Sequence, residues 1–137
     1  MSEQAVSATL LNLARAARER AYAPYSRFQV GAALETRDGR QFSGCNVENA
    51  AYGLCNCAER TALFGAIAAG CQPGDFSAIA IIADTPEPVS PCGACRQVLW
   101  ELCAPSMPVL LANLAGDTRL TTVDALLPDS FRLAHAR

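Results

Sequence analysis

The first third of the chain changes from a helical to an alternating pattern of apolar residues. Apolar side chains recur every three or four positions over residues 3–22, with most arginines on other faces, which predicts an amphipathic helix. Pro24 then breaks the helical pattern. Residues 28–36 alternate as a strand does, and Asp38-Gly39 is a strong signal for a two-residue hairpin turn into a return strand at 41–47.

The rest of the chain predicts helices and apolar strands in turn. Residues 57–70 are rich in good helix formers, and the near-continuous apolar run at 76–83 is typical of a strand buried on both faces. Pro91 is placed as in a first helical turn, and Asp124 is the expected cap of the final one. The elements expected after the hairpin are a helix at 57–70, a strand at 76–83, a helix at 91–103, strands at 108–114 and 120–123, and a helical turn at 124–131.

A hairpin followed by strand–helix alternation predicts an α/β fold. The expected arrangement is a mixed β-sheet of about five strands sandwiched between helices. The chain shows no internal repeat, low-complexity segment or linker, so a single domain over residues 1–137 is the simplest expectation.

Composition narrows the classes of function. With 51% hydrophobic and 18% charged residues the chain is able to bury a core, and its net charge of -2 provides no basic field for a nucleic-acid polymer. A small-molecule ligand is therefore favoured. The start of the chain lacks a signal-peptide pattern, and the run at 78–83 is too short to cross a membrane, so we expect a cytoplasmic protein without a membrane partner.

The seven cysteines indicate metal binding or catalysis, because a disulfide framework is not expected in a reducing compartment. Cys92 and Cys95 are three positions apart at the start of a predicted helix, and Cys57 opens another. Helix N-termini favour thiolates, which are the form that binds Zn²⁺. The single histidine, His135, is third from the end and is a poor candidate for a ligand or a base.

The number of ligands decides what such a site does. A closed site that includes Cys55 would be structural, whereas three cysteines leave an open position for catalysis. The single residue between Cys55 and Cys57 makes shared ligation awkward, and Glu59 is a carboxylate of the kind that shuttles protons beside an open metal site. Arg60 is expected near the ligands, where a guanidinium offsets the charge of three thiolates.

Two motifs resemble the signature of zinc-dependent nucleoside and nucleobase deaminases, namely "CAE" (57–59) and "PCGAC" (91–95). Further stretches narrow the resemblance to the small homotetrameric cytidine deaminases, and together they cover nearly the whole chain. These stretches are "YAPYSRFQVGAAL" (22–34), "GCNVENAAYGLCNCAERTAL" (44–63), "SPCGACRQVL" (90–99) and "LLPDSF" (126–131).

The resemblance implies a hydrolytic enzyme that converts cytidine and 2′-deoxycytidine to the uridines and ammonia in pyrimidine salvage. Cys57, Cys92 and Cys95 would bind one Zn²⁺ per subunit. Glu59 would be the proton shuttle, taking a proton from the attacking water and delivering it to the adjacent ring nitrogen before the amine leaves.

The resemblance also implies a homotetramer whose active sites are shared between subunits, and a set of residues that contact the substrate. Asn46 and Glu48 would hydrogen-bond the sugar hydroxyls, and Phe28 would pack on the pyrimidine. The other contacts would be the backbones of Ala58 and Cys92, which read the base edge, and the side chains of Tyr52 and Phe131, which reach in from neighbouring subunits.

Three other interpretations stay open at the level of sequence. A deaminase of the blasticidin type shares "CAE" and "PCGxCRQ" with this chain. A structural zinc module would use four cysteines, with Cys55 as the additional ligand. A dithiol oxidoreductase would use Cys92 and Cys95 as its redox pair.

Overall fold

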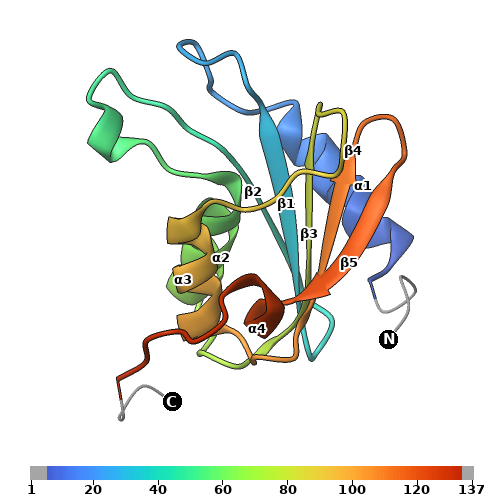
Figure 1. Ribbon diagram of the computed structural model, residues 1–137, viewed down its shortest axis with the longest axis vertical. Coiled ribbons are helices and arrows are strands. Elements are labelled where there is room, and N and C mark those ends of the chain that lie inside the picture. The colour runs from blue at the N-terminus through green and yellow to red at the C-terminus, as the bar shows by residue number, and fades with distance from the viewer. Residues whose placement is uncertain (1–5, 134–137) are drawn as a thin grey trace.

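The computed structural model describes residues 6–133, which form a five-stranded mixed sheet with helices on both faces (Figure 1). The sheet order is β2-β1-β3-β4-β5, in which only β3 and β4 are parallel neighbours. The strands are β1 (Val30–Thr36), β2 (Gln41–Cys45), β3 (Phe76–Ala83), β4 (Pro108–Asn113) and β5 (Thr118–Thr122). The helices are α1 (Ala8–Arg18), α2 (Ala58–Ala68), α3 (Gly93–Leu102), the four-residue α4 (Val123–Leu126) and the 3₁₀ turn η2 (Tyr52–Leu54). The predicted α/β sandwich is confirmed.

The two faces of the sheet pack against different helices. Helix α1 covers one face, where Leu10 and Ala14 pack against alternate residues of β1, β3 and β4. Helices α2, α3 and α4 cover the other face, with Leu63, Leu99 and Leu126 in its core. Because β3 lies in the middle of the sheet and is covered on both faces, all but one of its residues are buried, as its apolar run predicts.

Several predicted boundaries are wrong, one of them because a tertiary hydrogen bond replaces a local one. The first helix ends at Arg18 and not at residue 22, since the backbone of Tyr22 pairs with the segment after β2. The β1–β2 turn is one residue longer than predicted, because Thr36 pairs with Arg40 and Gly39 takes the left-handed backbone conformation, with φ of 91°. Thr122, and not Asp124, caps α4 through its side chain.

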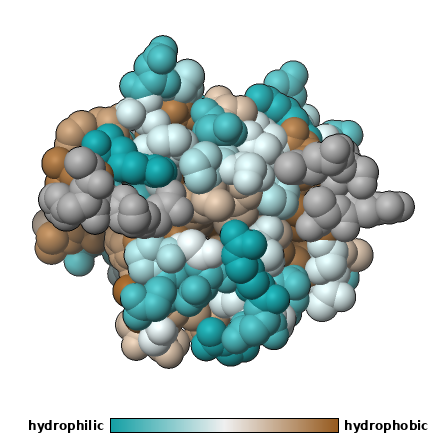
Figure 2. Space-filling view, turned by 90° about the horizontal axis from the view of Figure 1, so that it is seen from below, coloured by the Kyte–Doolittle hydropathy of each residue, from teal (hydrophilic) through white to brown (hydrophobic). Residues whose placement is uncertain are grey.

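The molecule has two distinct ends along the strand direction. The β1–β2 turn lies at the lower end in Figure 1, and Figure 2 shows that hydrophilic and neutral residues cover the centre of this end. The loops that enter α2 and α3 lie at the upper end (Figure 1). Among the helices of residues 6–133, none is long and apolar enough to span a membrane.

Two glycines allow helices to lie very close to the sheet. A Cβ at Gly31 of β1 would lie 2.0 Å from the carbonyl oxygen of Ala14 in α1. A Cβ at Gly44 of β2 would lie 2.5 Å from the amide nitrogen of Ala62 and 2.6 Å from the carbonyl oxygen of Ala58, both in α2. Since these are backbone atoms, a larger residue would displace the whole helix.

The Gly44→Ala variant is expected to lose about 1–3 kcal/mol of unfolding free energy, because its methyl group overpacks the β2–α2 contact. Urea denaturation measures this loss. The matched control is Gly65→Ala on α2, where an added Cβ meets no atom within 4 Å and alanine favours the helix. Equal stability of Gly44→Ala and the unchanged chain would contradict the close approach.

Candidate active site

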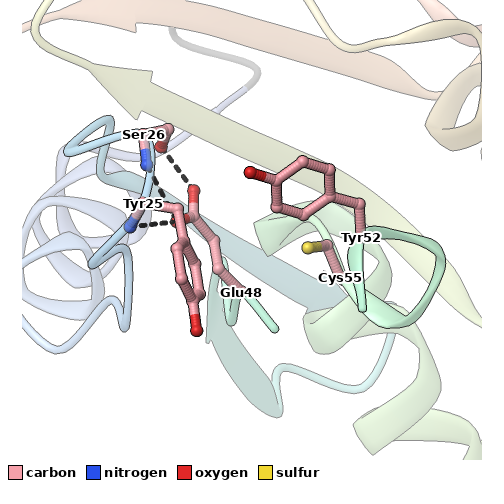
Figure 3. Close-up of a pocket in the computed structure, with 5 residues that line it drawn as sticks. All are labelled: Tyr25, Ser26, Glu48, Tyr52 and Cys55. Carbon is pink, nitrogen blue, oxygen red and sulfur yellow. Dashed lines mark hydrogen bonds between the residues drawn. The ribbon is translucent and has the colours of Figure 1, made fainter. Parts of the chain in front are cut away.

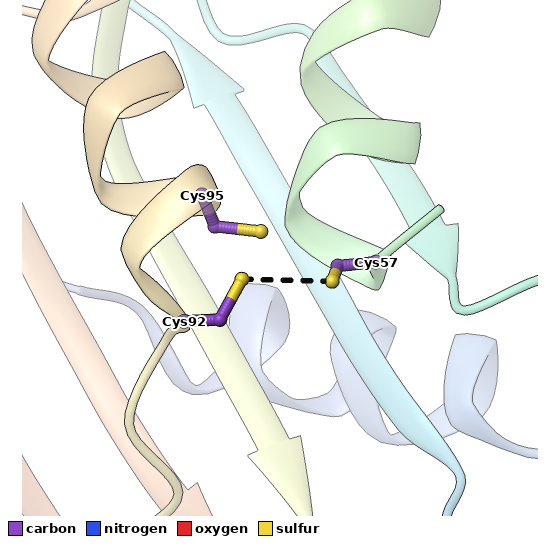
Figure 4. A group of neighbouring side chains, drawn as sticks. All are labelled: Cys57, Cys92 and Cys95. Atoms are coloured by element: carbon purple, nitrogen blue, oxygen red, sulfur yellow. Dashed lines mark hydrogen bonds between the residues drawn. The ribbon is translucent and has the colours of Figure 1, made fainter. Parts of the chain in front are cut away.

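Three cysteine side chains from two helix N-termini point toward one another (Figure 4). Cys57 is the N-cap of α2, Cys92 is the N-cap of α3, and Cys95 lies in the first turn of α3. Their sulfur atoms all lie within 4.8 Å of one another, and those of Cys57 and Cys92 are 3.8 Å apart. Both helices thus direct the positive ends of their dipoles at the same sulfur cluster.

The cluster has the donor chemistry and spacing of a zinc site. Two thiolates at about 2.3 Å from a tetrahedral zinc ion lie about 3.8 Å apart, and the sulfur atoms of Cys57 and Cys92 have this separation. Within residues 6–133 no other group of three or more metal-ligating side chains comes together. Three sulfur ligands would leave one position of a tetrahedral ion open, as in catalytic zinc sites.

Neighbouring groups favour negative charge on Cys57. The pKa of its thiol falls to about 5, mainly through a hydrogen bond with Cys95 and then through Arg60 and Cys92. A guanidinium nitrogen of Arg60 donates to Cys57 Sγ at 3.2 Å. The same contact raises the pKa of Arg60, while the hydrogen bond to Cys57 and burial raise the pKa of Cys95. Arg60 therefore lies where the sequence analysis expects a charge that offsets the thiolates.

Glu59 is a buried carboxyl beside this cluster. It lies in the first turn of α2, and only 4% of its surface is exposed. The N-terminus of α2 favours its anion, but burial and the nearby charge of Cys57 raise the pKa of Glu59. The raised pKa makes the carboxylate a stronger base, and it lies next to the sulfur atoms.

A cavity of about 170 Å³ opens onto the cluster and brings together most of the predicted site residues. Its walls are formed by Phe28, Val30, Asn46, Cys57, Ala58, Glu59, Val89, Ser90 and Cys92. Of these residues, Val30, Val89 and Ser90 were not predicted from the sequence. Val89 and Ser90 directly precede "PCGAC", so their place next to a ligand-bearing helix start was a usable signal.

Asn46 braces the wall that bears Phe28. Its side-chain amide donates to the carbonyl of Phe28 at 2.7 Å, and its side-chain oxygen accepts from the amide of Val30 at 2.8 Å. The segment that leads into β1 is therefore held in one position against the cavity, with one hydrogen of the Asn46 amide still able to bind a ligand.

Two predicted contacts, Glu48 and Tyr52, lie in a neighbouring pocket of about 260 Å³ with Tyr25, Ser26 and Cys55 (Figure 3). The Glu48 carboxylate accepts hydrogen bonds from the backbone amides of Tyr25 and Ser26 at 3.0 and 3.1 Å and from the Ser26 hydroxyl. These bonds, led by the one from the hydroxyl, lower the pKa of Glu48. Glu48 thus stays charged while it fixes the turn before Phe28.

Cys55 is separate from the sulfur cluster. Its sulfur accepts from the backbone amide of Asn49 at 3.3 Å and donates to the carbonyl of the same residue at 3.6 Å, which closes the loop containing Tyr52. The structure gives Cys55 a loop-closing contact and leaves it outside the cluster of Cys57, Cys92 and Cys95, contrary to the four-cysteine alternative.

The last predicted contact, Phe131, lines neither pocket. Its side chain is 67% exposed in the segment after α4. His135 lies outside the described residues.

Arg96, which follows Cys95 in the sequence motif, holds the segment that leads to Cys92. Its guanidinium donates to the carbonyl of Pro91 at 2.7 Å and to the hydroxyl of Ser90 at 2.7 Å.

Comparison with known proteins identifies the same family in sequence and in structure. Residues 5–111 match the family described as "Cytidine and deoxycytidylate deaminase zinc-binding region". The chain is 57% identical over 122 residues to a cytidine deaminase from Sporosarcina psychrophila, covering 89% of this chain and 88% of that protein.

Solved structures that are similar to this chain are also of cytidine deaminases. The crystal structure of cytidine deaminase from Burkholderia pseudomallei has a TM-score of 0.89 and 60% identity, and the match covers 96% of this chain and all of that one (100%). That of cytidine deaminase from Mycobacterium tuberculosis has a TM-score of 0.77 and 40% identity, covering 91% of this chain and 96% of that one.

Proposed function

The chain belongs to the cytidine and deoxycytidylate deaminase family. We propose that it hydrolyses the bond between C4 and the amino nitrogen of cytidine and 2′-deoxycytidine, with uridine or 2′-deoxyuridine and ammonia as products. The observation that best supports this reaction is the buried carboxyl of Glu59, which shares one cavity with two sulfur atoms of the three-cysteine cluster. A purely structural metal site has no use for such a carboxyl.

Cys57, Cys92 and Cys95 would hold one zinc ion per subunit, and zinc supplies Lewis acidity that makes a nearby water more acidic. The side chain of Arg60, bonded to Cys57, reduces the net negative charge of the three sulfurs. The two helix N-termini act in the same direction.

Glu59 moves protons between the water and the substrate. Its carboxylate accepts a proton from the attacking water, whose oxygen bonds to C4 of the pyrimidine, and delivers this proton to N3. The carboxylate then takes the second water proton from the oxygen now bound to C4 and passes it to the amino nitrogen, and the C4–N bond breaks with release of ammonia. Both protons and the oxygen of the water are thereby accounted for, and burial of Glu59 excludes bulk water from the transfers.

The cavity walls would orient the nucleoside. Phe28 would stack on the pyrimidine, the backbones of Ala58 and Cys92 would bond the base edge, and Asn46 would bond a sugar hydroxyl. Glu48 would accept a second hydroxyl, for which one of its carboxylate oxygens has a single partner in the turn. A carboxylate that accepts hydroxyl protons discriminates strongly against sugars that lack them.

We further propose a homotetramer in the cytoplasm that serves pyrimidine salvage, with active sites shared between subunits. The proposal is supported by large aromatic side chains that lie exposed at or near the two pockets, among them Tyr25, Phe28 and Tyr52, and by Phe131 in the last described segment. In this assembly Tyr52 and Phe131 would complete the site of a neighbouring copy.

Metal analysis together with a cytidine assay tests the proposed function. We expect about one zinc ion per chain and a fall in the near-ultraviolet absorbance of cytidine and 2′-deoxycytidine on mixing. Turnover of blasticidin S without turnover of cytidine would instead support the blasticidin type of deaminase. Zinc-free protein that reduces insulin disulfides would support a dithiol oxidoreductase.

A further inference from the structure

The segment that follows α4 lies between two contacts with the body of the protein. Just before it, a guanidinium nitrogen of Arg96 donates to the carbonyl of Leu126, the last residue of α4, at 2.9 Å. At its end, Arg132 donates to the carbonyl of Trp100 on α3 at 2.9 Å. Between these contacts the side chain of Phe131 is 67% exposed.

Arg132 also lies over the face of Trp100. The central carbon of its guanidinium is 4.1 Å from the ring centroid, well within the range of a cation–π contact. Its Nε is buried and has no hydrogen-bond partner among the described residues, so the flat guanidinium is held mainly by the ring and by one carbonyl. This contact combines a planar stack with a directional hydrogen bond, which a flexible surface cation does not provide.

The attachment fixes the backbone next to Phe131. Asp129 adopts a left-handed backbone conformation, with φ of 52°, which bends the chain after Pro128. From there only Ser130 and Phe131 separate the bend from Arg132. With both sides of Phe131 constrained, its backbone is fixed and its side chain lies exposed at the surface.

We propose that Arg132 is a positioning residue for substrate binding: its stack on Trp100 holds the last described segment so that Phe131 is presented to the active site of a neighbouring copy. The inference rests on the proposed function, which assigns Phe131 to that site. Ordering a segment before it binds lowers the entropic cost of binding. Loss of the stack should therefore weaken substrate binding and leave the chemical step unchanged.

The test compares Arg132→Met, which removes the cation, with Arg132→Lys, which keeps it. Trp100 is the only tryptophan of the chain, so its fluorescence reports this contact without any need for turnover. Arg132→Met is expected to increase acrylamide quenching of Trp100 and to raise the KM for cytidine about threefold to tenfold, with kcat unchanged. Arg132→Lys keeps a cation over the ring, so its increases in quenching and in KM are expected to be smaller than those of Arg132→Met.

A double variant separates positioning from general stability. If Arg132 acts through Phe131, Arg132→Met adds nothing to the higher KM of Phe131→Ala, because the aromatic ring that it positions is gone. The matched control is Arg40→Met, which removes the other cation–π contact of the described residues, 5.9 Å from Phe42, and should leave KM unchanged.

The outcomes separate the two hypotheses. Unchanged quenching of Trp100 in Arg132→Met would overturn the stack, and an unchanged KM, or a KM effect that adds in full to that of Phe131→Ala, would overturn the positioning role. A wild-type chain that takes up zinc but leaves cytidine unchanged would count against the proposed function instead, while the quenching measurement still decides whether the stack exists.

Discussion

The Glu59→Gln variant is expected to fold and bind zinc like the unchanged chain but to deaminate cytidine about 10²–10⁴ times more slowly. Glutamine has the same size as glutamate and fills the same buried position, but its amide does not carry a proton from the water to N3. The expected loss therefore lies in kcat. It is measured from the fall in absorbance at saturating cytidine, alongside the zinc content of the same sample.

Glu101→Gln is the matched control for this variant, because Glu101 is an exposed carboxylate on α3. Its kcat should equal that of the unchanged chain. If Glu59→Gln retained turnover within about threefold of the unchanged chain, an effect far below that of general acid–base catalysis, Glu59 would be removed from the mechanism.

The Cys95→Ala variant is expected to lose stoichiometric zinc and all measurable turnover, because two sulfur ligands remain of the three that the cluster provides. Cys95 is fully buried, so its loss also leaves a small gap at the start of α3. Metal analysis after dialysis measures the first effect, and circular dichroism shows whether the fold is retained.

Cys55→Ala is the corresponding control and decides between three and four ligands. Since the Cys55 sulfur bonds to the backbone of Asn49 and lies outside the cluster, this variant should keep its zinc and its kcat. Loss of zinc from Cys55→Ala would favour the structural four-cysteine module.

Elements with a strong periodic signal were predictable from the sequence. The strand at 76–83 has the predicted bounds because it is buried on both faces and its whole length is apolar. Boundaries decided by contacts across the fold were not predictable. Tyr22 and Val47 leave their predicted elements because their backbones pair with each other, and Val47 also pairs with Asn56.

For the candidate site, residue types and spacing were sufficient to choose the groups that the structure brings together. Cysteines and a carboxylate at the starts of two helices were brought together, as predicted, because both helices pack on one face of the sheet. Nothing in the sequence indicates that Glu48 accepts hydrogen bonds from the Tyr25–Ser26 turn or that Asn46 bonds to the backbone of Phe28. Those contacts join residues about twenty positions apart, and no local pattern encodes them.

The sequence by itself determined the family and the order of the elements, and its short motifs indicated Cys57, Glu59, Cys92 and Cys95 as the candidate site residues. Only the tertiary structure decided that Cys55 lies outside the cluster, that Arg60 bonds to Cys57, and that burial raises the pKa of Glu59. The physical reason is that ligation geometry and desolvation depend on distances between segments, and packing of α2 and α3 on the sheet sets those distances.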